Sequence, residues 1–295
     1  MQARILSRKP LSGIPSASGI EVTGGQVFVI GDDSAWLFVL NRQYELVRRI
    51  RLYEPVSGTA HRISKPLKAD LEAMAAFLYK GSPQLFVIGS GSAQNRNVGF
   101  RIETEGAFGI HAYDLSRFYG VLRRHPQIVG NRRLNLEGLA VSKDTIFFLQ
   151  RGNVSGINAL VSLPLSVFFD CLENNTPVAE PDIRNCQLPE IQGLLSGFSG
   201  LAAIDSHRLL FTATLENTAD EIADGQSLGS FAGVIDLRQP GTSLRFAPIL
   251  ADQPYAGKVE SIAVLEMVSE THLHALAVTD SDGGVSELLV LEIKW

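Results

Sequence analysis

The sequence has few cysteines, no long apolar run and no excess of positive charge. Only Cys171 and Cys186 occur among 295 residues, which is typical of a protein in a reducing cytoplasm. A disulfide between them is the alternative if the chain is exported. No stretch is long and apolar enough for a signal peptide or a membrane span. The net charge is −5 and the arginines are scattered, so no basic face is available for nucleic acid. We therefore expect a cytoplasmic protein that binds neither membrane nor nucleic acid.

The composition is that of an ordinary globular protein. Hydrophobic residues make up 45% of the chain and charged residues 19%, which is enough apolar material for a substantial core. The regular repeat described next favours a single domain over residues 1–295.

A short motif recurs along the chain at nearly constant spacing. Each copy begins with Glu or Ser, followed by a small residue, a large aliphatic residue or Met, and usually Ala. The copies begin at Ser18, Glu72, Glu137, Ser199 and Glu260. Their separations of 54, 65, 62 and 61 positions indicate a repeated supersecondary unit.

Each motif is followed by a short apolar run that ends at small or polar residues. These runs cover 27–30, 85–88, 146–149, 209–212 and 275–278. Short apolar runs bounded by turn residues are typical of buried strands. Third strands are predicted at 36–40, 160–163, 233–237 and 288–293, and a half-exposed fourth strand at 46–52.

This pattern predicts an all-β fold, a β-propeller of five blades, with six blades as the alternative. Five blades imply about 59 residues each, more than the roughly 40 to 50 of common propeller repeats. The surplus is assigned to insertions at 93–107, 116–133, 166–184 and 216–230, with a helix over 115–124. The N-terminal strand belongs to no preceding unit, so we expect it to close the last blade, which otherwise ends after its third strand.

The repeat also predicts where a site would lie. In a propeller, the loops that enter the innermost strands and those that follow the second strands open on one face, where function concentrates. This places at one pocket mouth the candidate ligand-binding residues Asp32, Asp33, Ser90, Arg96, Arg151, Asn153, Glu216, Asp280 and Asp282. We expect their ligand to be a small polar molecule, for example a phosphorylated or polyhydroxylated one, unless these side chains only stabilise their loops.

Three motif positions are glutamates, Glu72, Glu137 and Glu260, and would converge from different blades. Converging carboxylates repel unless a cation, an arginine or a shared proton offsets them. Oxygen-rich clusters suit calcium, so these residues are candidate calcium ligands. The alternative is a structural role, in which backbone amides of the neighbouring blade donate to each carboxylate.

His272 and His274 share one face of a predicted strand, the spacing of a pair of metal ligands. The sequence shows no third ligand nearby, which favours two exposed histidines over a metal site.

The segments 71–75 and 136–140 resemble the Asp/Asn-Leu-Glu-Gly-Leu/Ile-Ala element of the phytase-like and SdiA-regulated-like propeller families. The segments 89–92, 150–153 and 280–282 resemble those of an uncharacterised bacterial propeller family related to them. The resemblance implies a propeller with a calcium site in its channel and hydrolase ancestry. Ser18 and Ser199 depart from the glutamate of the motif, so a symmetric carboxylate ring is not implied.

Three functions therefore follow from the sequence. The first is binding of a small polar ligand at the channel mouth, with or without calcium. The second is a metal-assisted hydrolase of phosphoesters or lactones, in which Glu137 or Glu260 acts as ligand or base. The third, a protein-interaction scaffold, lacks a legible apolar stripe.

Overall fold

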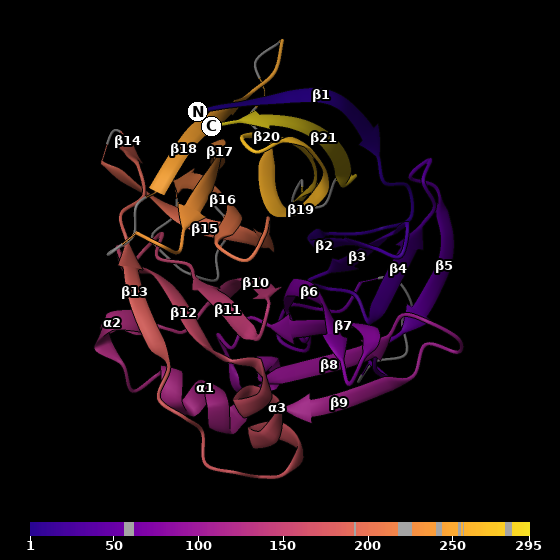
Figure 1. Cartoon of the computed structure of the whole chain (residues 1–295), viewed down its shortest axis with the longest axis vertical. Coiled ribbons are helices and arrows are strands. Elements are labelled where there is room, and N and C mark those ends of the chain that lie inside the picture. Colours follow the sequence, from indigo (N-terminus) through magenta and orange to yellow (C-terminus); the bar gives the residue numbers. More distant parts are fainter. Residues whose placement is uncertain are drawn as a thin grey trace.

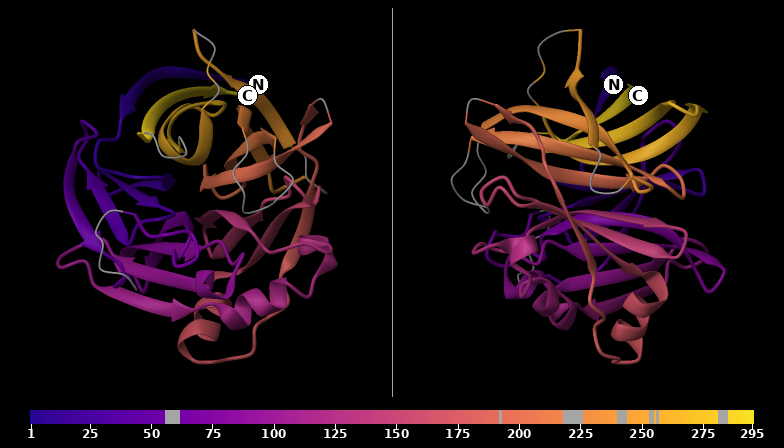
Figure 2. Two further views of the ribbon diagram at one scale, coloured as in Figure 1. Left: turned by 180° about the vertical axis from the view of Figure 1, so that it is seen from behind. Right: turned by 60° about the vertical axis from the view of Figure 1, so that its left-hand side comes forward.

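The computed structural model describes residues 1–55, 62–191, 193–217, 226–239, 244–252, 255, 257–280 and 285–295. Strands dominate this part of the chain, and its helices are short. The strands form antiparallel sheets that stand around a common centre, as Figure 1 and the reverse view in Figure 2 show. No described helix has the length and apolar character that crossing a membrane requires.

Three sheets contain four consecutive strands each, so that every connection is between neighbours in the sequence. The first has β2 (Ala17–Thr23), β3 (Gln26–Gly31), β4 (Trp36–Leu40) and β5 (Leu46–Arg51). The second has β6 (Leu71–Tyr79), β7 (Ser82–Gly89), β8 (Val98–Glu103) and β9 (Ile110–Asp114). The third has β10 (Leu136–Ser142), β11 (Thr145–Gln150), β12 (Asn158–Pro164) and β13 (Asp182–Cys186).

The remaining strands form one sheet of nine, in the order β14-β15-β16-β17-β18-β1-β21-β20-β19. One half has β14 (Glu190–Ile191), β15 (Leu194–Ala203), β16 (Arg208–Asn217), β17 (Gln226–Asp236) and β18 (Leu244–Leu250). The other half has β19 (Lys258–Ser269), β20 (His272–Asp280), β21 (Glu287–Lys294) and β1 (Gln2–Pro10). Among the described strands, β1 and β18 are the one parallel pair, and β1 pairs antiparallel with β21. The prediction that the N-terminal strand joins the last sheet is confirmed.

The innermost strands close a ring around the centre. β2 contacts β6, β6 contacts β10, β10 contacts β15, β15 contacts β19, and β19 returns to β2. Each of these strands contains one copy of the sequence motif, so the period read from the sequence corresponds to the observed sheets.

The sheets are buried on both faces, which explains the continuous apolar runs. In β20, Leu273 and Ala275 pack toward the β15–β18 half of the nine-stranded sheet, whereas Leu276 and Val278 pack toward the sheet of β2–β5. Each face of β20 therefore contributes to a separate apolar core.

Helices lie at the outer side of the ring (Figure 1). They are α1 (Ser116–Leu122), α2 (Pro126–Val129) and α3 (Leu165–Glu173), with a 3-10 turn at Gln94–Arg96. Phe168 and Phe169 of α3 stack edge-on against Phe86, and Phe168 also packs on Phe118. The predicted helix over 115–124 is confirmed, and 166–184 does hold a helical insertion.

The assignment of 93–107 to an insertion is wrong, because β8 occupies Val98–Glu103. Gly99 and Arg101 interrupt the apolar run, which hid the strand from the sequence pattern. An added Cβ at Gly99 would lie 2.9 Å from the Phe86 ring, so the neighbouring strand requires glycine there.

Candidate functional site

Each motif position coincides with an irregularity in its innermost strand. The register between the innermost strand and the next shifts at Ser18, Glu72, Glu137, Ser199 and Glu260. Such a β-bulge leaves one residue out of the ladder and re-aims its side chain. Four of the five, all but Ser199, line a cavity at the centre of the ring. The motif therefore marks the points where the strands turn a side chain toward the centre.

The residue two positions before each bulge is also central. Ser16, Asp70, Asn135 and Lys258 line the same cavity. In the fifth strand this residue is Gly197, where an added Cβ would lie 2.7 Å from Cγ of Arg151. Glycine at this position therefore leaves the space that the Arg151 side chain occupies.

The cavity is small and strongly charged. Its volume is about 60 Å³, whereas one water needs roughly 10–15 Å³ and drug-sized ligands occupy pockets of about 300–1,000 Å³. The described lining has seven carboxyl groups and five cationic side chains: Asp32, Asp70, Glu72, Glu137, Glu216, Glu260 and Asp280, with Lys65, Lys68, Arg96, Arg151 and Lys258. A few water molecules, an ion or a molecule of a few heavy atoms fits this space.

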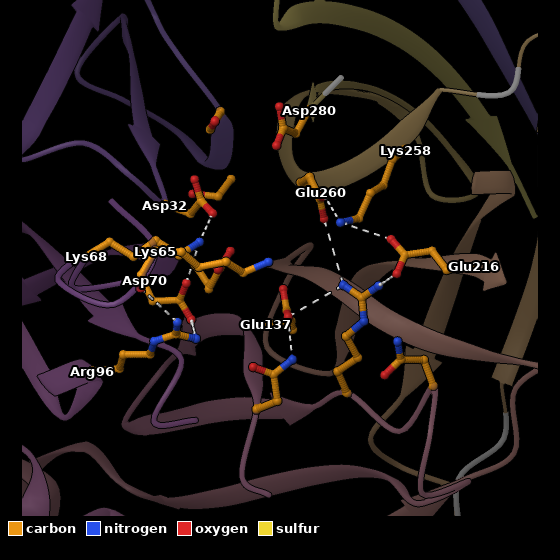
Figure 3. A pocket seen from close by; sticks show the side chains of 16 residues that line it. Asp32, Lys65, Lys68, Asp70, Arg96, Glu137, Glu216, Lys258, Glu260 and Asp280 are labelled. Carbon is orange, nitrogen blue, oxygen red and sulfur yellow. Dashed lines mark hydrogen bonds and ion pairs between the residues drawn. The ribbon is translucent and has the colours of Figure 1, made fainter. Parts of the chain in front are cut away.

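Lys68 and Arg96 hold the carboxylates on one side of the cavity (Figure 3). Nζ of Lys68 lies 2.7 Å from Oδ1 of Asp70 and also contacts Asp32. Nη1 of Arg96 donates to Oδ2 of Asp70 at 2.7 Å, and the Ser90 hydroxyl donates to the same oxygen. Asp70 is therefore saturated by protein donors.

Arg151 and Lys258 hold the carboxylates on the other side, where Figure 3 labels Lys258 beside Glu216 and Glu260. Nη2 of Arg151 lies 2.8 Å from Glu216, and Nη1 lies 3.5 Å from Glu137. Nζ of Lys258 lies 2.9 Å from Glu216 and 2.8 Å from Glu260. Because these residues come from the β10–β13 sheet and from both halves of the nine-stranded sheet, their ion pairs join these parts at the centre.

Glu72 is the exception among the lining carboxyl groups of the innermost strands. No described group donates a hydrogen bond to its carboxylate, which is half-buried and lines the cavity. Burial raises the pKa of Glu72 well above its usual 4.5, and the like charges of Glu137, Asp70 and Asp32 add to the rise, which Lys68 opposes. Glu72 therefore favours its protonated form until a positive charge arrives beside it.

The other two glutamates of the motif are paired. Asn135 donates to Glu137 at 2.7 Å, and Glu260 contacts Lys258. Burial nevertheless raises the pKa of Glu137, and it raises the pKa of Glu260 to about 8. The desolvation of these side chains outweighs the attraction of the neighbouring cations.

The structure brings most of the predicted site residues together. Lining the cavity are Asp32, Glu72, Arg96, Glu137, Arg151, Asn153, Glu216, Glu260 and Asp280. Asp33 and Ser90 lie next to it: Asp33 pairs with Arg62 at 2.8 Å, and buried Ser90 supports Asp70. Asp282 lies outside the described residues.

Sequence reasoning missed Asp70, Asn135 and Lys258, as well as Lys68. The first three share one position relative to the motif, two residues before its glutamate. Reading the motif as a bulge, with the residue two positions earlier also facing inward, would have found them. Lys68 had no such signal, because it precedes the strand and reaches the cavity from a loop.

Residues 13–293 match a family of unknown function, DUF6929. The chain belongs to this family. No curated protein matches the sequence.

Among solved structures, the Myxococcus xanthus glutaminyl cyclase resembles this member of DUF6929 with a TM-score of 0.53 at 11% identity, covering 99% of this chain and 97% of that one. The Cellvibrio cellulosa α-L-arabinanase, solved with arabinohexaose, resembles it with a TM-score of 0.51 at 11% identity, covering 98% and 93%. Both are β-propellers, and at this identity the likeness shows the fold alone. The propeller-like fold is confirmed, whereas the relation to the phytase-like and SdiA-regulated-like families stays a prediction.

Proposed function

We propose that the central cavity binds a small polar ligand that carries a positively charged group, and that Glu72 contacts this group. The observation that carries the proposal is the Glu72 carboxylate, which lines the cavity with no hydrogen bond from the described residues. Even partial burial of a carboxylate without a partner is costly, and a ligand cation supplies the missing partner.

The charge of the cavity supports a cationic ligand. When all are ionised, the seven described carboxyl groups exceed the five cationic side chains by two charges. Protons on carboxyl groups with raised pKa values offset this excess while no ligand is bound. A cationic ligand takes over that role and releases a proton as it binds.

The ring of innermost strands supports the finer fold assignment. We propose that the parallel β18–β1 contact separates two blades within the nine-stranded sheet, which makes a five-bladed propeller of the described strands. The closed sequence of contacts from β2 through β6, β10, β15 and β19 supports five units rather than six.

Calcium at this centre stays a prediction. Carboxylate oxygens of Asp32, Asp70 and Glu72 lie within 4.8 Å of one another, a spacing that favours some cation beside them. The ammonium group of Lys68 already contacts Asp32 and Asp70, so a calcium ion would compete with it. The predicted set of Glu72, Glu137 and Glu260 fits calcium less well, because Arg151 and Lys258 lie beside two of its members.

A second candidate is a hydrolase that uses Glu260 in proton transfer. A group whose pKa is about 8 exchanges its proton near neutral pH, as a general acid must. The test is hydrolysis of p-nitrophenyl phosphate by Glu260→Gln and by Glu173→Gln, a control substitution in α3 at the outer side of the ring. Loss of activity in the first variant alone would favour this candidate over simple binding.

The binding proposal is tested by thermal shift with three probes of similar length: 1,3-diaminopropane, glycerol and malonate. We expect a saturable rise in melting temperature with the diamine alone, since binding to the folded state stabilises it by mass action. Glu72→Gln should abolish the rise, and Glu173→Gln should keep it.

A rise with malonate or glycerol but not with the diamine would contradict the proposed ligand charge. A diamine response that is equal in wild type and Glu72→Gln would remove Glu72 from the site.

A further inference from the structure

Two histidines and a glutamate come together on the last sheet, and none of them lines the central cavity. His272 and His274 lie on one face of β20, the face that carries Leu276 and Val278 toward the sheet of β2–β5. Glu292 of β21 stands directly opposite His274 in the ladder. The structure therefore supplies the third side chain that the His-x-His pattern lacked.

The potential ligand atoms are close together. One atom each from His272, His274 and Glu292 can be chosen so that all three lie within 4.8 Å of one another. Nε2 of His272 lies 3.1 Å from Oε1 of Glu292, and the two imidazole rings are 5.6 Å apart at an interplanar angle of 89°.

The imidazole of His272 is not satisfied by this contact. Its Nε2 is buried, yet no described group makes a hydrogen bond of acceptable geometry with it. Leaving such an atom without a partner is unfavourable. A metal ion between this nitrogen and the Glu292 carboxylate would satisfy both groups.

His274 is oriented by a second carboxylate. Oε1 of Glu266, on the neighbouring strand β19, lies 2.8 Å from Nδ1 of His274. A carboxylate on one ring nitrogen commonly fixes a histidine whose other nitrogen binds a metal. This arrangement leaves Nε2 of His274 as its ligand atom.

We propose that His272, His274 and Glu292 bind one divalent transition-metal ion of the zinc type, with Glu266 as the positioning residue for His274. Two imidazole nitrogens and one carboxylate oxygen are a ligand set that suits zinc and leaves a coordination position for water. All three side chains are partly exposed, at 21–27%, so the ion can enter from solvent.

Lys294 is the local competitor. Its Nζ lies 2.7 Å from Oε1 of Glu292 and lowers the pKa of that carboxyl group, which keeps it ionised. The lysine side chain is 45% exposed, so it can turn to solvent when a metal ion takes its place. Lys294→Ala should therefore strengthen metal binding or leave it unchanged.

The test is calorimetric titration of the untagged full chain with zinc chloride, together with the visible absorption of the cobalt-loaded protein. We expect one ion per chain, with tetrahedral or five-coordinate cobalt bands. His274→Ala and Glu292→Gln should weaken zinc binding at least tenfold, and Glu266→Gln about 10–100-fold, the usual effect of an outer-shell partner.

His125→Ala is the matched control. His125 pairs with Glu180 at 3.1 Å, but among the described residues this pair belongs to no group of three potential metal ligands. It should bind zinc as wild type does. If His274→Ala loses its native circular dichroism, His274→Gln replaces it. No zinc binding by wild type up to 1:1 at about 0.1 mM protein, or unchanged affinity in both His274 and Glu292 variants, would overturn the proposal.

Discussion

The guanidinium group of Arg151 lies 2.8 Å from the carboxylate of Glu216, and both side chains are buried. The two residues belong to different sheets, since Arg151 follows β11 and Glu216 lies in β16. Gly197, on β15 between them, has no side chain that would displace the arginine. Their ion pair therefore depends on the packing of adjacent sheets around the centre.

Arg151→Met should be strongly destabilising, by about 3–5 kcal/mol, because it leaves buried carboxylates without a partner. Urea denaturation measures the loss in the free energy of unfolding. Arg184→Met is the matched control: Arg184 is half-buried and pairs at 3.1 Å with exposed Asp182, so the cost should be below about 1 kcal/mol. Equal costs would contradict the view that the central ion pairs hold the sheets together.

The N-terminal strand should be essential to the last sheet. Ile5 is 8% exposed and packs in the core between the two halves of the nine-stranded sheet, whereas Leu6 is 48% exposed. Ile5→Asp should cost at least about 3 kcal/mol, since it buries a carboxylate without a partner. Leu6→Asp should change the melting temperature little.

Deleting residues 1–10 is the stronger form of the same test, because β21 then keeps only β20 as a partner and its other edge is exposed. One cooperative transition at a much lower temperature is expected. A melting temperature that neither the deletion nor Ile5→Asp lowers would argue against closure by β1.

The stability of the fold should fall between about pH 4.5 and pH 7 because of Glu21. Its carboxylate accepts hydrogen bonds from the amides of Val22 at 2.9 Å and Ala76 at 3.0 Å, and burial raises its pKa to about 7. The folded state therefore binds a proton that the unfolded state has released above about pH 4.5. Folding loses up to about 1.4 kcal/mol per pH unit across this window, and nothing further above it.

Urea denaturation of wild type and Glu21→Gln from pH 4 to pH 8 measures this contribution. The stability of wild type relative to the variant should fall as the pH rises to about 7 and then level off. A difference that stays constant throughout would show that Glu21 does not titrate in this window.

The sequence predicted the strands better than the site. The apolar runs at 27–30 and 146–149 lie within β3 and β11 because both faces of each sheet are buried, so a continuous run is the expected signal. The break at Gly99 and Arg101 concealed β8, since glycine there reflects the close Phe86 ring rather than a loop.

The convergence of Glu72, Glu137 and Glu260 followed from their shared place in the repeat, and the structure brings them to one cavity. Arg151 was also placed at this pocket mouth by the repeat, but its pairing with Glu216 could not be predicted. Lys68 could not be predicted at all, because it reaches the centre from a loop whose path the motif does not specify.

The pH dependence of diamine binding tests most directly whether Glu72 binds a positively charged group of the ligand. Calorimetric titration with 1,3-diaminopropane at pH 6 and pH 8 should show affinity rising with pH, because burial raises the pKa of Glu72 and the diamine binds its ionised form. Glu72→Gln should bind the diamine at neither pH. Diamine affinity that is independent of pH in wild type, or wild-type affinity in Glu72→Gln, would contradict the account.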